Sequence, residues 1–278
     1  MSTVENSEWK TNEGEKMFSQ KWLTDGQTKA VVVLVHGLGE HIGRYNHVAK
    51  FLNQNQISVY GFDHRGHGKS SGKRGHIGSN QFFMSDIDHM IAEAKKENPE
   101  IPIFIYGHSL GGNMVLYYAL SKNPAIKGVI ATSPGLGTGE PVPPAKLLAA
   151  KILKTLVPAM TMDNGLDVNN LSHNPQVIKD YQEDPLVHPM ISAKLATLMF
   201  SNGDWIIENA SKFNLPLLLL QGEKDHIVSL EKTKLFAQKV TASLITFKIF
   251  PGLYHEMHNE YEQDQVLSYI LEWINQHC

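Results

Sequence analysis

The sequence predicts one large α/β domain with a mostly parallel β-sheet and helices on both of its faces. Three observations lead to this prediction. From residue 30 onward, short apolar runs alternate with longer stretches of helical periodicity. The apolar runs are continuous, as expected for parallel strands that are buried on both faces. The chain has 278 residues, which suits one domain that carries an insertion.

The predicted strands each end at a glycine, a proline or a polar residue that begins a turn. They are Ala30–Val35, Ser58–Phe62, Pro102–Tyr106, Gly128–Thr132, Leu215–Leu220 and Ile245–Phe250. The predicted helices between and after them are roughly Arg44–Asn53, Asn80–Lys96, Gly111–Ser121, Leu230–Lys239 and Glu262–Gln276. The N-terminal residues, together with Glu15–Leu23, are expected to form an edge hairpin or strand.

The alternation of strands and helices stops between residues 135 and 210, where prolines are frequent. A long segment of this kind inside a compact domain is usually an inserted lid or cap rather than a loop. We therefore expect a core formed by residues 1–134 and 211–278, and an inserted helical cap formed by residues 135–210.

One stretch of this predicted cap, residues 146–157, is amphipathic. With about 100° per residue, its lysines fall on one face and most of its large apolar side chains fall opposite. The lysines are Lys146, Lys151 and Lys154, and the apolar residues are Leu148, Ile152, Leu153, Leu156 and Val157. Two interpretations remain open: the helix packs on its own domain, or it is a lid that makes transient contact with a membrane.

The composition argues against several classes of protein. The formal net charge is −3 at pH 7, without the basic excess that would favour nucleic acid as a partner. The one cysteine, Cys278, is the last residue, which excludes an intrachain disulfide and argues against thiol catalysis. The first residues lack the layout of a signal peptide, and no apolar run approaches about 18 residues. These features favour a cytoplasmic protein or one peripheral to a membrane.

A G-x-S-x-G motif, Gly107-His108-Ser109-Leu110-Gly111, is the strongest local signal in the chain. A predicted strand precedes the motif and a predicted helix follows it. Such a tight turn holds the serine in strained backbone geometry, and the small flanking residues relieve the crowding. The turn also places the serine hydroxyl at the positive end of a helix. In this context the motif is typical of the nucleophile of the α/β-hydrolase fold.

A serine hydroxyl is a weak nucleophile at neutral pH and needs a base within hydrogen-bond reach. In this fold the acid and the base follow the serine along the chain, in that order. Asp225 lies just past the fifth predicted strand and His255 just past the sixth, at the edge where parallel strands end. Glu223 and His258 are the nearest alternatives. We favour Asp225 as the acid and His255, which comes first after its strand, as the base.

Acyl transfer also needs N–H donors directed at the oxyanion of the tetrahedral intermediate. The backbone N–H that follows the nucleophile, that of Leu110, supplies one donor, and the loop after the first predicted strand supplies another, that of Leu38. The histidine pairs His64/His67 and His255/His258 lack an accompanying cysteine cluster or an HExxH motif. No glycine-rich nucleotide-binding motif is present either. We therefore predict no metal and no cofactor.

Five motifs point together to one family. They are His36-Gly37-Leu38-Gly39-Glu40-His41 with Gly43-Arg44-Tyr45, Asp63-His64-Arg65-Gly66-His67-Gly68-Lys69-Ser70, Gly107-His108-Ser109-Leu110-Gly111-Gly112, Tyr181-x-x-Asp184-Pro185-Leu186 and Tyr254-His255-x-x-His258-x-Glu260. In these motifs the chain resembles the monoacylglycerol lipases and the related bacterial lysophospholipases, from about residue 7 to its end. The resemblance implies an α/β-hydrolase fold with a cap that forms a hydrophobic acyl tunnel.

The resemblance also implies roles for individual residues. By motif position, the triad is Ser109, Asp225 and His255, and the oxyanion donors are the N–H groups of Leu38 and Leu110. More weakly, the residues that line the glycerol end are Glu40, Arg44, Tyr181 and His258. The expected reaction is hydrolysis of a monoacylglycerol, a small lipid ester, to fatty acid and glycerol through an acyl-enzyme. Alternatives with the same triad are a lysophospholipase, a general carboxylesterase or an acyltransferase, and the alternative without catalysis is a lipid-binding protein.

Overall fold

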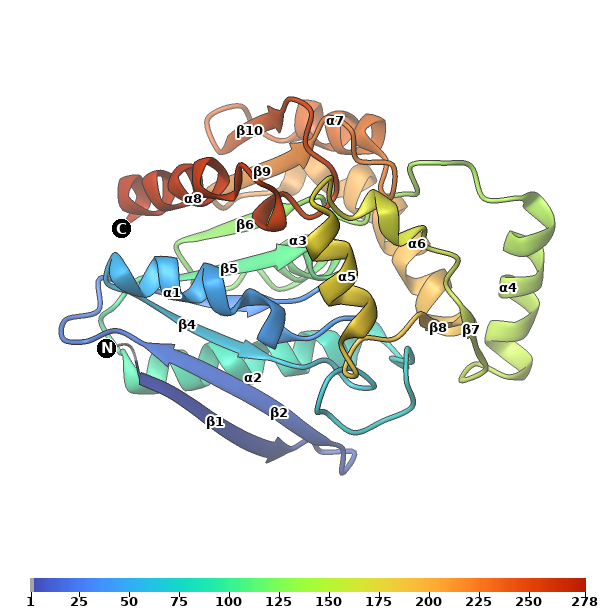
Figure 1. Ribbon diagram of the computed structural model, residues 1–278, viewed down its shortest axis with the longest axis horizontal. Helices are drawn as coiled ribbons and strands as arrows, with labels where there is room; N and C mark the ends of the chain where they lie inside the picture. Colours follow the sequence, from blue (N-terminus) through green and yellow to red (C-terminus); the bar gives the residue numbers. More distant parts are fainter. Residues whose placement is uncertain (1–2) are drawn as a thin grey trace.

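The computed structural model describes residues 3–278, apart from the side chains of residues 144, 146, 147, 149 and 151. At its centre is an eight-stranded sheet in the order β1-β2-β4-β3-β5-β6-β9-β10 (Figure 1). Strand β2 pairs antiparallel with β1 and with β4, and the other neighbours pair in parallel. The strands are β1 (Thr3–Lys10), β2 (Lys16–Leu23), β3 (Ala30–Val35), β4 (Ile57–Phe62), β5 (Ile103–His108), β6 (Gly128–Thr132), β9 (Leu217–Gly222) and β10 (Ile245–Phe250).

Helices cover both faces of the sheet. The helices of the core are α1 (Asn46–Gln54), α2 (Asn80–Glu97), α3 (Leu110–Lys122), α7 (Leu230–Lys239) and α8 (Gln263–His277). Helices α1 and α8 pack on one face, and α2, α3 and α7 pack on the other. Successive side chains of a strand point to opposite faces, so a strand covered on both sides must be apolar throughout. The predicted α/β class with a mostly parallel sheet is confirmed.

The predicted elements and the observed ones differ in detail. All six predicted strands are present, with bounds shifted by at most two residues. The predicted edge hairpin is the pair β1–β2. The helix predicted over residues 44–53 is divided into a 3₁₀ turn, η1 (Ile42–Tyr45), and α1. Strand β5 runs on to His108, so that it ends directly at Ser109.

The segment between β6 and β9 crosses the carboxyl edge of the sheet. It contains α4 (Pro144–Leu156), β7 (Thr161–Asp163), η2 (Val168–Asn170), α5 (Pro175–Glu183), β8 (Met190–Ser192), α6 (Ala193–Asn209) and η3 (Ala210–Lys212). Strands β7 and β8 form a small antiparallel pair that the sequence analysis missed, because each has three residues. Helix α6 packs on α3 and α7 and adds Leu195, Ile206 and Ile207 to the core. The cap bounds at residues 135 and 210 stay a prediction.

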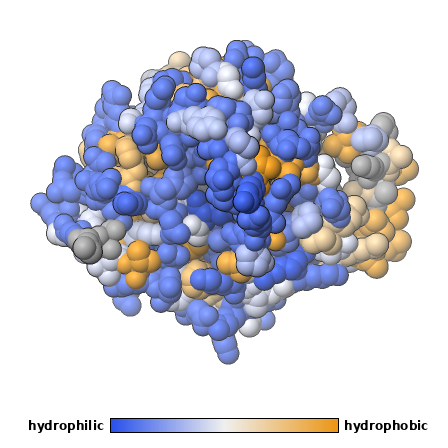
Figure 2. Space-filling model, in the orientation of Figure 1, coloured by the Kyte–Doolittle hydropathy of each residue, from blue (hydrophilic) through white to orange (hydrophobic). Residues whose placement is uncertain are grey.

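Helix α4 lies at one end of the molecule, away from the sheet (Figure 1). Leu148, Ile152 and Leu156 are 61%, 51% and 72% exposed, and Val157 beyond the helix is 43% exposed. Figure 2 shows hydrophobic atoms gathered at this end of the surface. Helix α4 nevertheless packs on α6, so it contacts its own domain while these apolar side chains stay in solvent, and contact of the helix with a membrane stays a prediction. Lys146 and Lys151, predicted on the opposite face, lie outside the described side chains.

None of the described helices is both long enough and apolar enough to cross a membrane.

Candidate active site

Ser109 forms the whole turn between β5 and α3. Its φ is 54°, in the left-handed region that residues other than glycine rarely adopt. Its N–H donates to the carbonyl of Thr132 at 3.0 Å, and its own carbonyl accepts from the N–H of Gly135 at 2.9 Å. Both partners lie at or just after the end of β6, so the strained turn is held by the neighbouring strand.

Two glycines allow the turn to pack this closely. A Cβ atom on Gly107 would collide with the backbone of Gly111, and a Cβ atom on Gly111 would collide with the carbonyl oxygen of Val35. The start of α3 therefore lies directly against the end of β3. Ser109 is 8% exposed at the N-terminus of α3, where the helix dipole favours negative charge.

Asp225 and His255 are brought together although they are 30 residues apart. The Nδ1 atom of His255 lies 2.9 Å from Oδ2 of Asp225. Asp225 Oδ1 accepts from the N–H groups of Ile227 and Val228, and Oδ2 also accepts from the Nε2 amide of Gln221. Because Nδ1 is engaged by a carboxylate, Nε2 is the His255 nitrogen that remains for proton exchange.

The two groups shift each other's pKa. Burial alone would lower the pKa of His255, but the Asp225 carboxylate raises it, with further increases from Glu256 and Glu40, and the pKa is raised overall. Burial alone would raise the pKa of Asp225, but His255 and the backbone N–H donors lower it below its usual value. A carboxylate that stays ionised beside a histidine favours the protonated ring, as a general base requires once it has taken a proton.

The loop after β3 passes beside Ser109. A Cβ atom on Gly37 would lie 3.4 Å from Cβ of Ser109, and Leu38 is the next residue. On the other side, Leu110 is the first residue of α3, so its N–H has no partner within the helix. Both predicted oxyanion donors thus belong to segments next to Ser109, and their role stays a prediction.

A buried ionic cluster lies behind this loop. Arg44 Nη1 donates to Glu40 Oε2 at 2.8 Å, and its Nη1 and Nη2 donate to the two oxygens of Glu256 at 2.7 Å each. The guanidinium also stacks on the ring of Tyr181 from α5, with 4.8 Å between its Cζ atom and the ring centroid. Three residues predicted at the glycerol end therefore contact one another, and Glu256 joins them.

His258, the fourth residue predicted at the glycerol end, is buried and stacks on Tyr45 with 4.8 Å between ring centroids. Neither of its ring nitrogens has a hydrogen-bond partner among the residues that the structure describes. Burial holds its pKa well below the usual value, so the ring is neutral. A neutral imidazole can donate one hydrogen bond and accept another, which suits a hydroxyl group.

Two residues that support the site, Ser133 and Glu260, were given no role by the sequence analysis, although Glu260 lies in the last family motif. Ser133, at the end of β6, donates its hydroxyl to the carbonyl of His255 at 2.9 Å. Glu260 accepts from the hydroxyl of Ser172 at 2.5 Å and from the N–H of Tyr254 at 2.9 Å, and so ties the inserted segment to the histidine loop. The available signals were the place of Ser133 at the end of a predicted strand and the place of Glu260 within a motif. The alternative acid, Glu223, instead accepts from the N–H of Gly252.

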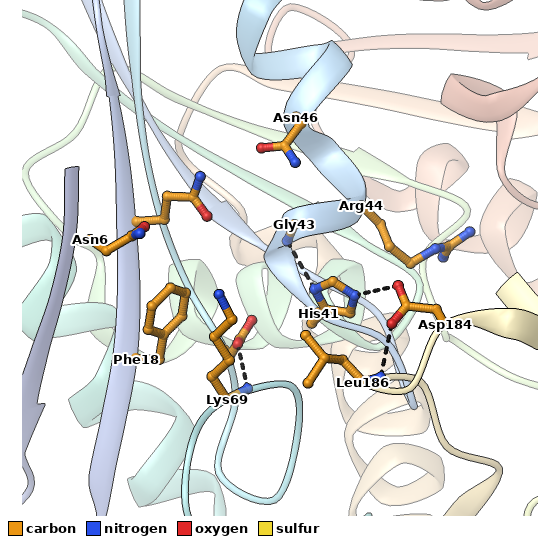
Figure 3. A pocket seen from close by; sticks show the side chains of 11 residues that line it. Asn6, Phe18, His41, Gly43, Arg44, Asn46, Lys69, Asp184 and Leu186 are labelled. Carbon is orange, nitrogen blue, oxygen red and sulfur yellow. Dashed lines mark hydrogen bonds and ion pairs between the residues drawn. The ribbon is translucent and has the colours of Figure 1, made fainter. Parts of the chain in front are cut away.

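A polar pocket of about 460 Å³ opens beside the cluster (Figure 3). Its lining includes Asn6, Gln20, His41, Arg44, Lys69 and Asp184. His41 and Asp184 form a 2.8 Å contact that joins the loop after β3 to the inserted segment. Ser109 and His255 are not among the lining residues, so this pocket is distinct from the space around the serine.

Within the described part of the chain, no group of three or more histidine, cysteine, aspartate or glutamate side chains could hold a metal ion. The histidines at 36, 64 and 67 do cluster, with ring centroids 3.9 to 5.8 Å apart. The ring of His36 bonds to the carbonyl of Gly37 and to the N–H of His64, and the ring of His64 bonds to the carbonyl of His36, as in a structural core.

Comparison with known proteins places the site in context. Residues 26–262 match the family described as serine aminopeptidase, S33. The monoacylglycerol lipase of Mycolicibacterium smegmatis is 34% identical over 95% of this chain and 94% of its own length. The phospholipase YtpA of Bacillus subtilis is 30% identical over 89% of this chain and 95% of its own. The crystal structure of the Paleococcus ferrophilus monoacylglycerol lipase has a TM-score of 0.88 and 38% identity, and the alignment covers 94% of this chain and 99% of that one.

The close contact between Gly111 and the end of β3 can be tested by a substitution that changes the stability of the protein. In Gly111→Ala the new methyl group meets backbone atoms that cannot move aside, and we expect the free energy of unfolding to fall by about 1–3 kcal/mol. Urea denaturation followed by circular dichroism measures the change. Ser121→Ala, an exposed substitution on the same helix, should stay within about 0.5 kcal/mol of the parent. An unchanged unfolding midpoint in Gly111→Ala would contradict this account of the turn.

Proposed function

Because the chain belongs to the family described as serine aminopeptidase, S33, we propose that it is a serine hydrolase that converts monoacylglycerols to fatty acid and glycerol. One observation carries the proposal: the buried Asp225–His255 pair and the strained turn of Ser109 lie at the same edge of the sheet. The substrate class is supported by similarity over nearly the whole chain to proteins named monoacylglycerol lipases.

In the proposed mechanism, the Ser109 hydroxyl attacks the ester carbonyl carbon while Nε2 of His255 takes its proton. Asp225 stabilises the imidazolium, and the N–H groups of Leu38 and Leu110 stabilise the oxyanion. The bond between the carbonyl carbon and the glycerol oxygen then breaks, and His255 returns the proton to that oxygen. Water, deprotonated by the same histidine, attacks the acyl-enzyme. The bond between the carbonyl carbon and the Ser109 oxygen then breaks, His255 returns the proton to that oxygen, and the fatty acid leaves.

Recognition of glycerol is a finer proposal. Of the four residues implied by the family resemblance, His258 has two unengaged ring nitrogens, and we assign it to hydroxyl groups of the alcohol. Tyr181, which is 7% exposed and lies over Arg44, lines the same proposed alcohol site. The polar atoms of Glu40 and Arg44 bind each other and their neighbours, so these two residues shape the alcohol site rather than reach far into it.

We also propose that residues 135–210 act as a cap over the acyl chain and that α4 docks on lipid. The exposed apolar side chains of α4 support the docking, because an amphipathic helix of this kind buries its apolar face at a membrane interface. A location peripheral to membranes follows from this proposal.

Ser109→Ala tests the nucleophile. Loss of the hydroxyl removes the acyl-enzyme route, and kcat should fall on the order of 10⁴ to 10⁶-fold. A fluorophosphonate probe should label the parent at Ser109 and leave the variant unlabelled. Near-normal turnover by the folded variant would overturn the assignment, and an unlabelled parent would favour a lipid-binding protein without catalysis.

A matched substrate panel tests the alcohol and acyl preference. It contains monoacylglycerols of several chain lengths, a diacylglycerol, a lysophosphatidylcholine and a short p-nitrophenyl ester. We expect the highest kcat/KM for a monoacylglycerol. Preference for the lysophospholipid, which the similarity to the Bacillus phospholipase makes the second candidate, would keep the triad and replace the proposed substrate.

Sedimentation with phosphatidylcholine vesicles tests the docking of α4. Replacing both Leu148 and Ile152 by serine removes two exposed apolar side chains, and membrane partitioning should fall by more than about tenfold. Leu235→Ser is the matched control, because Leu235 is 43% exposed on α7, a different helix. No binding by the parent, or equal binding by the double variant, would contradict the proposal.

A further inference from the structure

Arg44 joins two carboxylates that belong to different parts of the site. The side chain of Arg44 is 10% exposed, and those of Glu40 and Glu256 are 3% exposed each. One guanidinium nitrogen is shared between the two carboxylates, and Glu256 is bound by both nitrogens in a bidentate pair. A bidentate pair of this kind fixes direction as well as distance.

Each carboxylate is attached to a loop that the proposed reaction uses. Glu40 Oε1 accepts from the N–H of Gly37 at 2.7 Å, and Gly37 directly precedes the proposed oxyanion donor Leu38. Glu256 directly follows His255, and its N–H donates to the carbonyl of Leu171 in the inserted segment at 2.8 Å. A continuous path of three side chains therefore runs from the oxyanion loop to the histidine loop.

We propose that Glu256 is a positioning residue: through Arg44 and Glu40 it holds the loop of His255 against the oxyanion loop, and its negative charge favours the imidazolium that forms during acyl transfer. This inference rests on the proposed serine hydrolase function. Glu256 does not touch the proposed reacting atoms, and it acts through the backbone of His255 and through its electric field.

The two carboxylates of the cluster differ in their electrostatics. Both face one guanidinium, and burial raises the pKa of Glu40. Burial would raise the pKa of Glu256, but Arg44 holds it well below its usual value, and this carboxylate therefore stays ionised. Charges in a site of low dielectric interact more strongly than they would in water.

Several charged or titratable groups besides Glu256 surround His255 and influence the pKa of its ring. Asp225, after β9, engages Nδ1 and raises the pKa of the ring most among its charged neighbours. His108, at the end of β5, lies 4.8 Å away between ring centroids and is neutral, because burial lowers its pKa to about 3. Glu256 and Glu40 raise the pKa of His255 further. Loss of the Glu256 charge should therefore lower the pKa of His255.

Glu256→Gln tests the inference in the full-length protein. A general base must be neutral, so kcat/KM rises with pH through the pKa of His255. With the charge removed, we expect the acid limb of the plot of kcat/KM against pH, measured with the p-nitrophenyl ester, to move to lower pH by about half a unit to one unit. Turnover on the alkaline plateau should fall about tenfold through misplacement of His255, with KM changed less than about twofold.

Two further variants separate charge from geometry. Glu256→Asp keeps the charge but shortens the side chain, so the acid limb should stay in place while kcat on the plateau falls. Glu231→Gln is the control, because it removes a carboxylate on α7 that is 83% exposed. Its acid limb and its kcat on the alkaline plateau should match those of the parent.

The outcomes can be told apart. If Glu256→Gln folds and keeps the parent's acid limb and kcat, the proposed role of Glu256 is overturned. If Glu256→Gln does not fold, a Glu256→Asp variant with the parent's kcat overturns that role. In either case, labelling of Ser109 by a fluorophosphonate in the parent leaves the proposed hydrolase function standing. A parent that is neither labelled nor active overturns both proposals.

Discussion

The approach of α3 to the end of β3 constrains the rest of the site. Gly107 and Gly111 let the backbones meet, and hydrogen bonds from Ser109 to the end of β6 hold the turn at a φ that serine rarely adopts. Such strain costs about 1–3 kcal/mol and persists only where the surroundings over-determine it. The serine therefore cannot adjust to its partners. The loops that bear Leu38 and His255 must be brought to it by other interactions.

Those interactions are largely buried and polar. Removing one partner of a buried ion pair typically costs about 3–5 kcal/mol, because the remaining charge is left without compensation. Because burying both charges costs desolvation energy that their attraction only offsets, such a pair adds little net stability, but the cost of breaking it holds the joined segments in place. On the sheet side, His255 is fixed by Asp225, which binds its ring and is itself bound by Gln221, and by Ser133, which binds its carbonyl. Glu256, in our proposal, fixes its loop from the opposite side, and each of these contacts joins segments far apart in sequence.

Local sequence patterns were sufficient for the parallel strands of the large sheet, and they led to the proposed triad. Unbroken apolar runs locate parallel strands, and their carboxyl ends locate Ser109, Asp225 and His255 because topology brings those ends to one edge. The roles of Ser133, Gln221 and Glu256 depend on which side chain reaches which loop, and no periodicity encodes that. The apolar face of α4 shows the same limit: amphipathicity predicted the helix, but it could not decide between a packed face and an exposed one.

The inserted segment divides into a fixed part and an exposed part, and this division suits an amphiphilic ester. Its middle is tied to the histidine loop by the Leu171 carbonyl, which accepts from the N–H of Glu256. It is tied to the loop after β3 by the pair of Asp184 with His41 and by the N–H of His188, which donates to the carbonyl of Gly39. Helix α4, at the other end, packs on α6 and leaves apolar side chains in solvent. A glycerol headgroup needs polar partners at fixed positions, since a misplaced hydrogen bond loses its value. An acyl chain needs only apolar area, which a surface helix can offer without precise geometry. The buried polar contacts of the inserted segment thus lie near the proposed reacting atoms, and its exposed apolar side chains lie where lipid could reach them.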